Sequence, residues 1–125
     1  MALSQFIVCR ALTLYARPAK EERQMPVTVT GSGRELTAHI SGEVDHHGAR
    51  EIMGELDREI NAALPRRLAL DLSGVTFMDS SGIAVLLRAR RRMGELDGVL
   101  TVGNIPAQAR RVLEAAGIGR IVELV

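Results

Sequence analysis

From Val27 onward, short apolar runs with strand periodicity alternate with longer stretches whose apolar residues recur at helical spacing. The first two runs, at residues 27–30 and 36–40, alternate apolar with polar side chains and are joined by a Gly-Ser-Gly connection at 31–33. Such alternation predicts half-buried strands, and the short connection predicts that the two pair antiparallel. The helical stretches that follow constrain the fold most, because strands separated by helices pair in parallel through right-handed crossovers.

Three amphipathic helices are predicted after these strands. The first is preceded by Asp45, a suitable N-cap, and is ended by Pro65; the third begins near Pro106 and ends at Gly117, where a left-handed C-terminal cap belongs. The predicted inward faces are Ala49, Ile52, Met53, Leu56, Ile60, Ala63 and Leu64 in the first helix, Ile83, Leu86, Leu87 and Met93 in the second, and Ile105, Ala109, Val112, Leu113 and Ala116 in the third.

Two further strands are predicted at residues 68–72 and 99–102, and residues 121–125 predict a short last strand or an irregular end. The expected order is therefore β-β-α-β-α-β-α with one more strand in addition. We predict an α/β fold, in which a mixed sheet of four or five strands carries helices mainly on one face.

Residues 1–24 do not share this pattern, because an apolar stretch interrupted by Arg10 runs into the charged residues 20–23. No basic residue precedes the apolar stretch, so a signal peptide is disfavoured. We interpret residues 1–24 as an N-terminal extension, either disordered or lying before a true start at Met25. Residues 25–125 are interpreted as one domain.

Charge and cysteine usage limit the partners that we expect. The net charge of +1 provides no overall field for nucleic acid or an anionic membrane, and no apolar run approaches the roughly 20 residues that span a bilayer. A single cysteine, Cys9, cannot form an intrachain disulfide and indicates a reducing compartment. We therefore expect a cytoplasmic protein that contacts neither nucleic acid nor membrane.

Polar residues follow three of the predicted parallel strands, at residues 43–47, 78–82 and 103–106. The carboxyl ends of parallel strands share one edge of a sheet, and partners or ligands are commonly bound there. We expect this edge to carry Asp45, His46, Asp79, Ser80, Ser81 and Asn104.

The Asp79-Ser80-Ser81-Gly82 segment at a strand-to-helix turn has two interpretations. Asp and Ser are preferred helix caps, so these residues could serve only to begin the helix. Alternatively, Ser80 is a phosphoacceptor, because the dipole and free N–H groups of a helix N-terminus can accommodate a phosphate.

Three segments, at residues 42–47, 77–83 and 106–118, resemble the anti-sigma factor antagonist family of STAS domains, and most of all its sporulation-type member. The resemblance extends from about Val27 to the C-terminus. It implies a non-enzymatic protein that binds an anti-sigma factor, itself a serine kinase, and thereby releases a sigma factor. It also implies that this kinase phosphorylates Ser80 and that a metal-dependent serine phosphatase reverses the reaction.

The same resemblance implies roles for neighbouring residues. Asp79 would lie beside the phosphoacceptor, Ser81 would support the turn, and Asp45 falls in a loop implicated in kinase contact. Nucleotide binding is suggested for Asp45 and Ser80, whereas no cofactor is implied. The alternative function is that of a STAS module which binds a small ligand or acts as a stress-signalling scaffold.

Two chemical alternatives use the same loops and are disfavoured. A metal site could draw on Asp45, His46, His47 and Asp79, but adjacent histidines at a helix start point in different directions, so no metal is expected. A hydrolase could use Ser80 with His46 as base, but the G-x-S-x-G elbow is absent.

Two charged features outside these loops are given structural interpretations. The cluster Arg88, Arg90, Arg91 and Arg92 is expected to form a solvated helix face, or to contribute to partner electrostatics, rather than to bind nucleic acid. Asp71, within an apolar strand, is expected to face outward with a hydrogen-bond partner, although a functional role is open.

Overall fold

The computed structural model describes residues 26–125, so the interpretation of residues 1–24 lies outside the described part of the chain. The first two predicted strands form an antiparallel pair, β1 (Val27–Ser32) and β2 (Glu35–Val44), with Val27 opposite Ile40. Gly31, near the end of β1, and Gly33, in the connection, both have positive φ angles, which glycine adopts without steric cost.

The remaining strands, β3 (Arg67–Met78), β4 (Val99–Gly103) and β5 (Glu123–Leu124), extend the sheet in parallel from β2. The spatial order is β1-β2-β3-β4-β5, so each new strand is added at the same side of the sheet. The predicted α/β fold with a mixed sheet is therefore confirmed, with the short C-terminal segment as the fifth strand.

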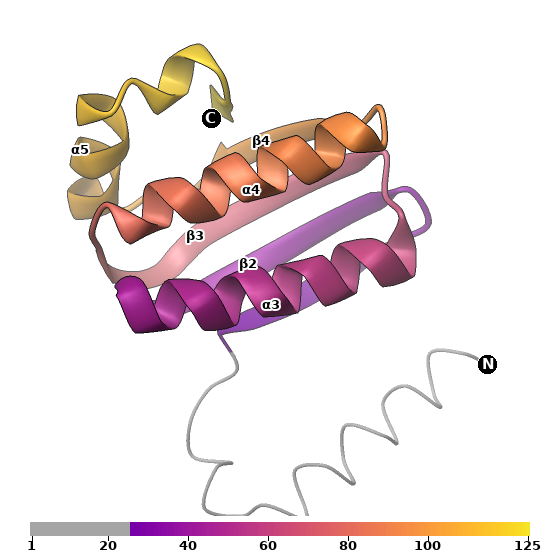
Figure 1. The fold of residues 1–125 in the computed structure, drawn as a ribbon, viewed down its shortest axis with the longest axis horizontal. Helices are drawn as coiled ribbons and strands as arrows, with labels where there is room; N and C mark the ends of the chain where they lie inside the picture. Colours follow the sequence, from indigo (N-terminus) through magenta and orange to yellow (C-terminus); the bar gives the residue numbers. More distant parts are fainter. Residues whose placement is uncertain (1–25) are drawn as a thin grey trace, which may run out of the picture.

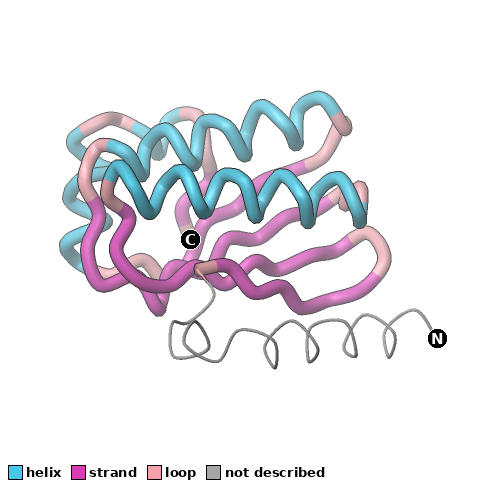
Figure 2. Tube along the Cα trace, turned by 60° about the horizontal axis from the view of Figure 1, so that its bottom comes forward, coloured by secondary structure: helices cyan, strands magenta, loops and turns pink. Residues whose placement is uncertain are grey.

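The two long helices, α3 (His46–Ala63) and α4 (Ser81–Glu95), lie side by side across one face of the sheet (Figures 1 and 2). The core lies between these helices and alternate residues of the strands, such as Leu68, Leu70 and Leu72 of β3. In Figure 1 the third helix, α5 (Ala107–Ala115), lies beside the start of α4, and the 3-10 turn η1 (Ile118–Arg120) follows it above the first half of α4. None of the helices between residues 26 and 125 is long and apolar enough to cross a membrane.

Strand β3 is longer than the prediction of residues 68–72, because Ser73 and Gly74 do not form a turn. The pairing register with β2 shifts at this point: His39 lies opposite Asp71, but Ser41 lies opposite Gly74. A side chain at Gly74 would begin 2.8 Å from the Ser41 Cβ, so glycine allows the close approach. The bulge lets β3 continue as a strand for several residues past the end of β4.

The predicted inward face of α4 is partly wrong. Leu87 is 40% exposed, while Val85 and Ala89 are buried together with Gly82, Leu86 and Met93. The buried face of α4 includes Gly82, and a glycine does not indicate a buried face as an apolar side chain would. In the other helices, Ala63, Leu64 and Ala116 are also exposed, because they lie at helix C-termini where the chain leaves the core.

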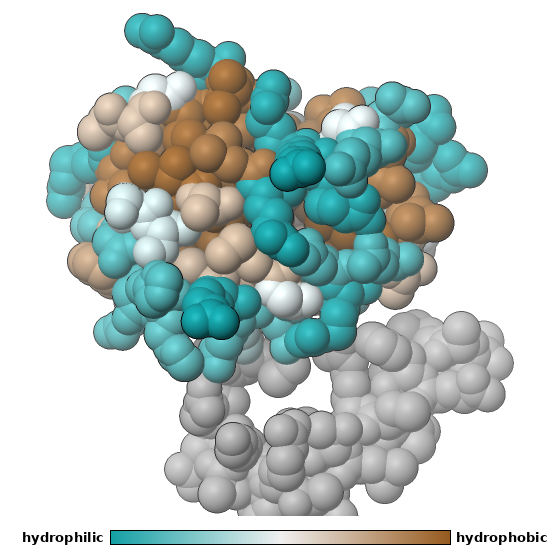
Figure 3. All heavy atoms as spheres, in the orientation of Figure 1, coloured by the Kyte–Doolittle hydropathy of each residue, from teal (hydrophilic) through white to brown (hydrophobic). Residues whose placement is uncertain are grey.

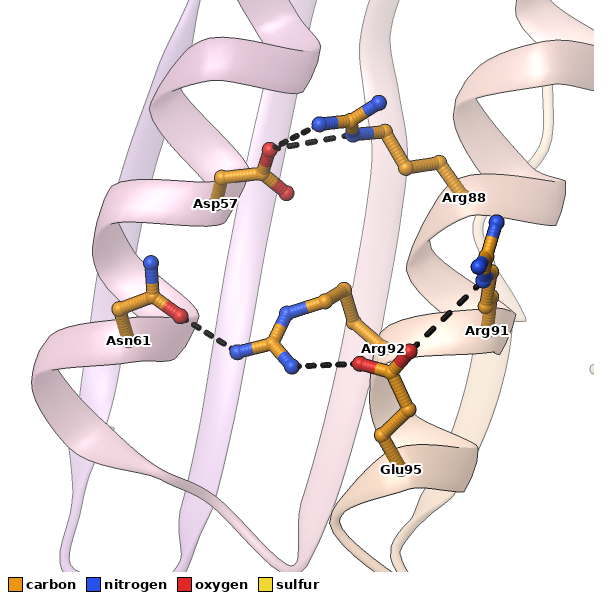
Figure 4. Close-up of polar contacts among 6 residues, drawn as sticks. All are labelled: Asp57, Asn61, Arg88, Arg91, Arg92 and Glu95. Carbon is orange, nitrogen blue, oxygen red and sulfur yellow. Dashed lines mark hydrogen bonds and ion pairs between the residues drawn. The ribbon is translucent and has the colours of Figure 1, made fainter.

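The arginines of α4 have partners within the protein, which Figure 4 shows for Arg88, Arg91 and Arg92. Arg88 donates to the carboxylate of Asp57 on α3, at 2.7 Å from Nη2 and 3.0 Å from Nε. Arg92 bonds both Asn61 of α3 and Glu95 of its own helix, and the Nε of Arg90 donates to the Ile121 carbonyl at 3.1 Å. Arg91 lies 3.7 Å from Glu95, so all four arginines have partners within the protein, as their structural interpretation expects.

Candidate functional site

The loops that begin α3 and α4 are neighbours, because the strands before them end side by side. Val44, the last residue of β2, lies opposite Met78, the last residue of β3. The next residue, Asp79, donates its backbone N–H to the Val44 carbonyl at 3.2 Å. The structure therefore brings the predicted residues at 45–46 and 79–81 to one end of the sheet.

The Asp45 loop begins α3 as predicted. Asp45 has an extended backbone, and its Oδ1 accepts a hydrogen bond from the Gly48 N–H at 2.8 Å, which is the geometry of an N-cap. The following residues, His46 and His47, are both exposed at the helix surface. The Asp45 carboxylate is thus engaged in capping, and the nucleotide contact suggested for it stays a prediction.

The Ser80 loop has a different arrangement, in which Asp79 rather than Ser80 supplies the capping side chain. Asp79 Oδ1 accepts from the Ser81 N–H at 2.7 Å, and the Asp79 carbonyl accepts from the Gly82 N–H at 3.0 Å. Ser80 is exposed, has φ −63° and ψ −17°, and its hydroxyl makes no capping hydrogen bond. Capping therefore explains Asp79 but does not explain the serine at position 80.

The expectation that free N–H groups would hold a phosphate on Ser80 is wrong for the first turn of α4. The N–H groups of Ser81 and Gly82 are bonded to Asp79, and that of Ile83 is bonded to the Ser80 carbonyl at 3.1 Å. The helix dipole still favours negative charge at this end. A phosphate on Ser80 would consequently gain from the dipole while these amides kept their present partners.

Gly82 allows the first turn of α4 to pack closely against Met78 at the end of β3. A Cβ at this position would lie 2.5 Å from Cγ and 2.6 Å from Sδ of Met78. The first turn of α4 therefore packs directly against the side chain of Met78, two residues before Ser80. This contact, together with the Asp79–Val44 bond, fixes the base of the Ser80 loop.

The structure places Asn104 away from the other predicted site residues. Strand β4 ends at Gly103, opposite Asp71, and the Asn104 side chain donates to Asp71 Oδ1 at 3.2 Å. From Asp71, β3 continues for seven residues to Met78, which is about 20 Å of extended chain. Strand β4 therefore ends seven residues before β3 does, and Asn104 bonds Asp71 in the middle of β3, not a residue of the Ser80 loop.

Asp71 is the centre of a polar network on the sheet. It accepts from the Ser73 N–H at 2.9 Å and from His39 Nδ1 at 2.8 Å, and Nε2 of His39 lies 3.1 Å from the Thr30 hydroxyl. Hydrogen bonds to the charged form, above all the one from the Ser73 backbone, lower the pKa of Asp71 to about 2, although burial acts in the opposite direction. The expected hydrogen-bond partners of Asp71 are confirmed.

Gln108, which is not among the predicted site residues, contacts the start of the Ser80 loop from α5. Its Oε1 accepts from the Met78 N–H at 2.8 Å, and its Nε2 donates to the Met78 carbonyl at 2.7 Å. Nothing in the sequence marks this residue, because a glutamine near the start of a helix usually faces solvent. Gln108 therefore links α5 to the residue that precedes this loop, whereas Asn104 bonds Asp71.

The arrangement lends no support to the two chemical alternatives. Among residues 26–125, no three His, Cys, Asp or Glu side chains form a group that could hold a metal ion. In the same part of the chain, the Ser80 hydroxyl forms no hydrogen bond with His46, the proposed base of a hydrolase.

The mixed five-stranded sheet, the helices on its one face and the serine that opens α4 define an α/β domain of the STAS class. The chain belongs to the STAS domain family: the family model described as "Mlab, STAS domain" matches residues 27–124.

Relatives of this chain are named as regulators of sigma factors. An anti-sigma F factor antagonist of Paenibacillus polymyxa is 28% identical over 89 residues, which cover 71% of this chain and 76% of the relative. The solved structure of the anti-sigma factor antagonist SpoIIAA in its unphosphorylated form matches with a TM-score of 0.67 and 22% identity, over 79% of this chain and 87% of SpoIIAA. The phosphorylated form of Bacillus SpoIIAA matches with a TM-score of 0.60 and 22% identity, over 79% and 90% of the two chains.

Proposed function

We propose that this protein is a cytoplasmic anti-sigma factor antagonist controlled by phosphorylation of Ser80. In its unphosphorylated form it binds an anti-sigma factor that is also a serine kinase, and binding releases the sigma factor. The kinase modifies Ser80 and so ends the interaction, and a serine phosphatase restores the active form. The names of the relatives support the antagonist role, and the solved phosphorylated form of SpoIIAA is a precedent for this kind of modification.

The observation that carries the proposal is the exposed hydroxyl of Ser80, which has no hydrogen-bond partner within the described residues 26–125. It stands at the N-terminus of a 15-residue helix, while the neighbouring Asp79 performs the capping. A kinase requires a hydroxyl that can be reached without breaking existing structure, and Ser80 meets that condition. Ser81 is less accessible and lies within the helix, so it is the poorer acceptor.

A phosphate at this position changes charge more than shape. It adds about −1.5 to −2 charges, which the dipole of α4 favours, so the fold tolerates it. A partner that presents carboxylates to the same surface is repelled, and like-charge contacts at an interface cost several kcal/mol. About 2.7 kcal/mol already lowers affinity a hundredfold.

The surface next to Ser80 is suited to a protein partner. Leu87, two helical turns after Ser80, lies on the same side of α4 and is 40% exposed, with the partly buried Ile83 between them. An apolar patch covers the first half of α4 and the adjacent C-terminal elements on this face (Figure 3). We propose that the anti-sigma factor contacts this side of α4 together with Ser80, Ser81, Asp79, Asp45 and His46.

The experiment that tests the proposal is phosphorylation of the purified protein by candidate anti-sigma factor kinases with ATP, with the modified site mapped by mass spectrometry. We expect one phosphate on Ser80, none on the Ser80→Ala variant, and normal modification of Ser81→Ala. Ser80→Ala should keep its affinity for the kinase and Ser80→Asp should lose it. Equal affinities of these two variants, or modification at another residue, would contradict the proposal.

A further inference from the structure

The last residue of β3, Met78, occupies an unusual position in the sheet. On one side it pairs with Val44 of β2. On the other side, no strand of residues 26–125 accompanies it, because β4 ends opposite Asp71, seven residues earlier. The backbone N–H and carbonyl of a strand residue need partners when they are partly buried, so this gap has to be filled by other groups.

The side-chain amide of Gln108 fills this gap. Its oxygen accepts from the Met78 N–H at 2.8 Å and its nitrogen donates to the Met78 carbonyl at 2.7 Å, and both bonds are part-buried. A primary amide presents one acceptor and one donor in a plane, as a peptide group does. Gln108 therefore makes with Met78 the two hydrogen bonds that a residue of a neighbouring strand would make.

We infer that Gln108 is a positioning residue for the phosphoacceptor, and this inference rests on the function proposed above. Met78 is followed directly by Asp79, whose N–H is bonded to Val44 and whose carboxylate orients the Ser81 N–H. The base of the Ser80 loop is thus held by β2 on one side and by α5 on the other. Gln108 fixes the direction in which Ser80 is presented and couples this loop to α5.

The substitution Gln108→Met separates hydrogen bonding from packing, because methionine has nearly the same length and a high helix propensity but no amide. Arg111→Met, at an exposed position of the same helix, is the matched control. Gln108→Asn keeps the amide but is one methylene too short to reach Met78 from the same backbone position. It serves as a second variant should Gln108→Met fold poorly, which thermal unfolding would reveal.

The first measurement is amide hydrogen exchange by NMR on the full chain. In Gln108→Met and Gln108→Asn we expect the Met78 amide to exchange at least tenfold faster than in the wild type, and the resonances of residues 79–82 to shift. Arg111→Met should leave both unchanged. Wild-type exchange and shifts at these residues in both Gln108 variants would overturn the inference.

The second measurement is the rate of Ser80 phosphorylation by the anti-sigma factor kinase that modifies the wild type. We expect a slower rate in both Gln108 variants, by roughly five- to tenfold, and the wild-type rate in Arg111→Met. Faster exchange at Met78 with an unchanged phosphorylation rate would show a purely structural bond and overturn the positioning role. Absence of phosphorylation in the wild type would refute the proposed function itself, and the positioning role with it.

Discussion

The α-carbon of Gly48 lies so close to the Glu43 carbonyl that a Cβ at position 48 would begin 2.1 Å from that oxygen. The contact joins the first turn of α3 to the end of β2, and it involves backbone atoms that cannot move aside as a flexible side chain can. The contact therefore limits the angle between β2 and α3. The Asp45 cap lies between these two elements, next to the Ser80 loop.

The first prediction concerns this glycine. Gly48→Ala should lower the free energy of unfolding by about 3 kcal/mol, because it forces an atom into a closely packed site. Gly94→Ala is the matched control, since Gly94 lies within α4 and no atom of the described residues 26–125 comes within 4 Å of its Cβ position. That control should raise stability by up to about 1 kcal/mol through helix propensity alone. Urea unfolding of both variants measures the difference, and a similar change in both would contradict the close contact.

The second prediction concerns pH and Asp71. Because its pKa in the folded state is lowered to about 2 from an ordinary 3.8, the charged form adds stability above pH 4 that is lost as pH falls toward 2. Asp71→Asn should therefore cost about 1–2 kcal/mol at pH 7 and much less at pH 2.5. Urea unfolding of wild type and variant at the two pH values gives the comparison, and a cost independent of pH would argue against the charge-assisted bonds.

The third prediction tests the partner surface on α4. Leu87→Gln should weaken binding to the anti-sigma factor kinase tenfold to a hundredfold, as loss of an interface side chain can. Its effect on the free energy of unfolding should stay within about 0.5 kcal/mol, as at most surface positions.

Leu64→Gln is the control for this experiment. Leu64 is 57% exposed and follows the C-terminal end of α3, at the end of the helix away from Asp45. Titration calorimetry with the same kinase should show wild-type affinity for this variant. Equal losses in the two variants would mean that general surface hydrophobicity, and not the side of α4 next to Ser80, drives the interaction.

The fourth prediction concerns the backbone at Leu64, which has φ 47° and ψ 58° as the C-cap of α3. A left-handed conformation costs a branched residue about 1 kcal/mol relative to glycine. Leu64→Gly should thus stabilise the protein by about 0.5 kcal/mol once the greater chain entropy of glycine is included. Leu87→Gly, in the middle of α4, should instead destabilise it by about 1 kcal/mol, and thermal unfolding distinguishes the two signs.

The regular parts of the fold could be predicted from the sequence because their signals are local. The Asp45 cap, the left-handed Gly117 and the alternation of strands and helices each depend on a few neighbouring residues. The Asp79-Ser80-Ser81-Gly82 turn was placed correctly at the start of α4 for the same reason.

The errors arise where one element is fitted to another. Ser73 and Gly74 have turn chemistry, but pairing with β2 keeps them in a strand, so β3 runs on past the point where Asn104 bonds Asp71. Gln108 could not be found because its partner is a backbone group 30 positions away. Leu87 was predicted to be buried because the sequence does not show that the face of α4 containing Gly82 packs against Met78.

The backbone N–H groups of Ser81, Gly82 and Ile83, which already have hydrogen-bond partners, affect how a phosphate on Ser80 would be removed. A phosphate whose neighbouring backbone donors are already bonded is not enclosed by those donors, so a phosphatase would reach it without first opening the helix. The fraction of protein in each state would then follow the balance of the two opposing enzymes rather than a slow structural change. A cell could reset the protein as fast as that balance shifts.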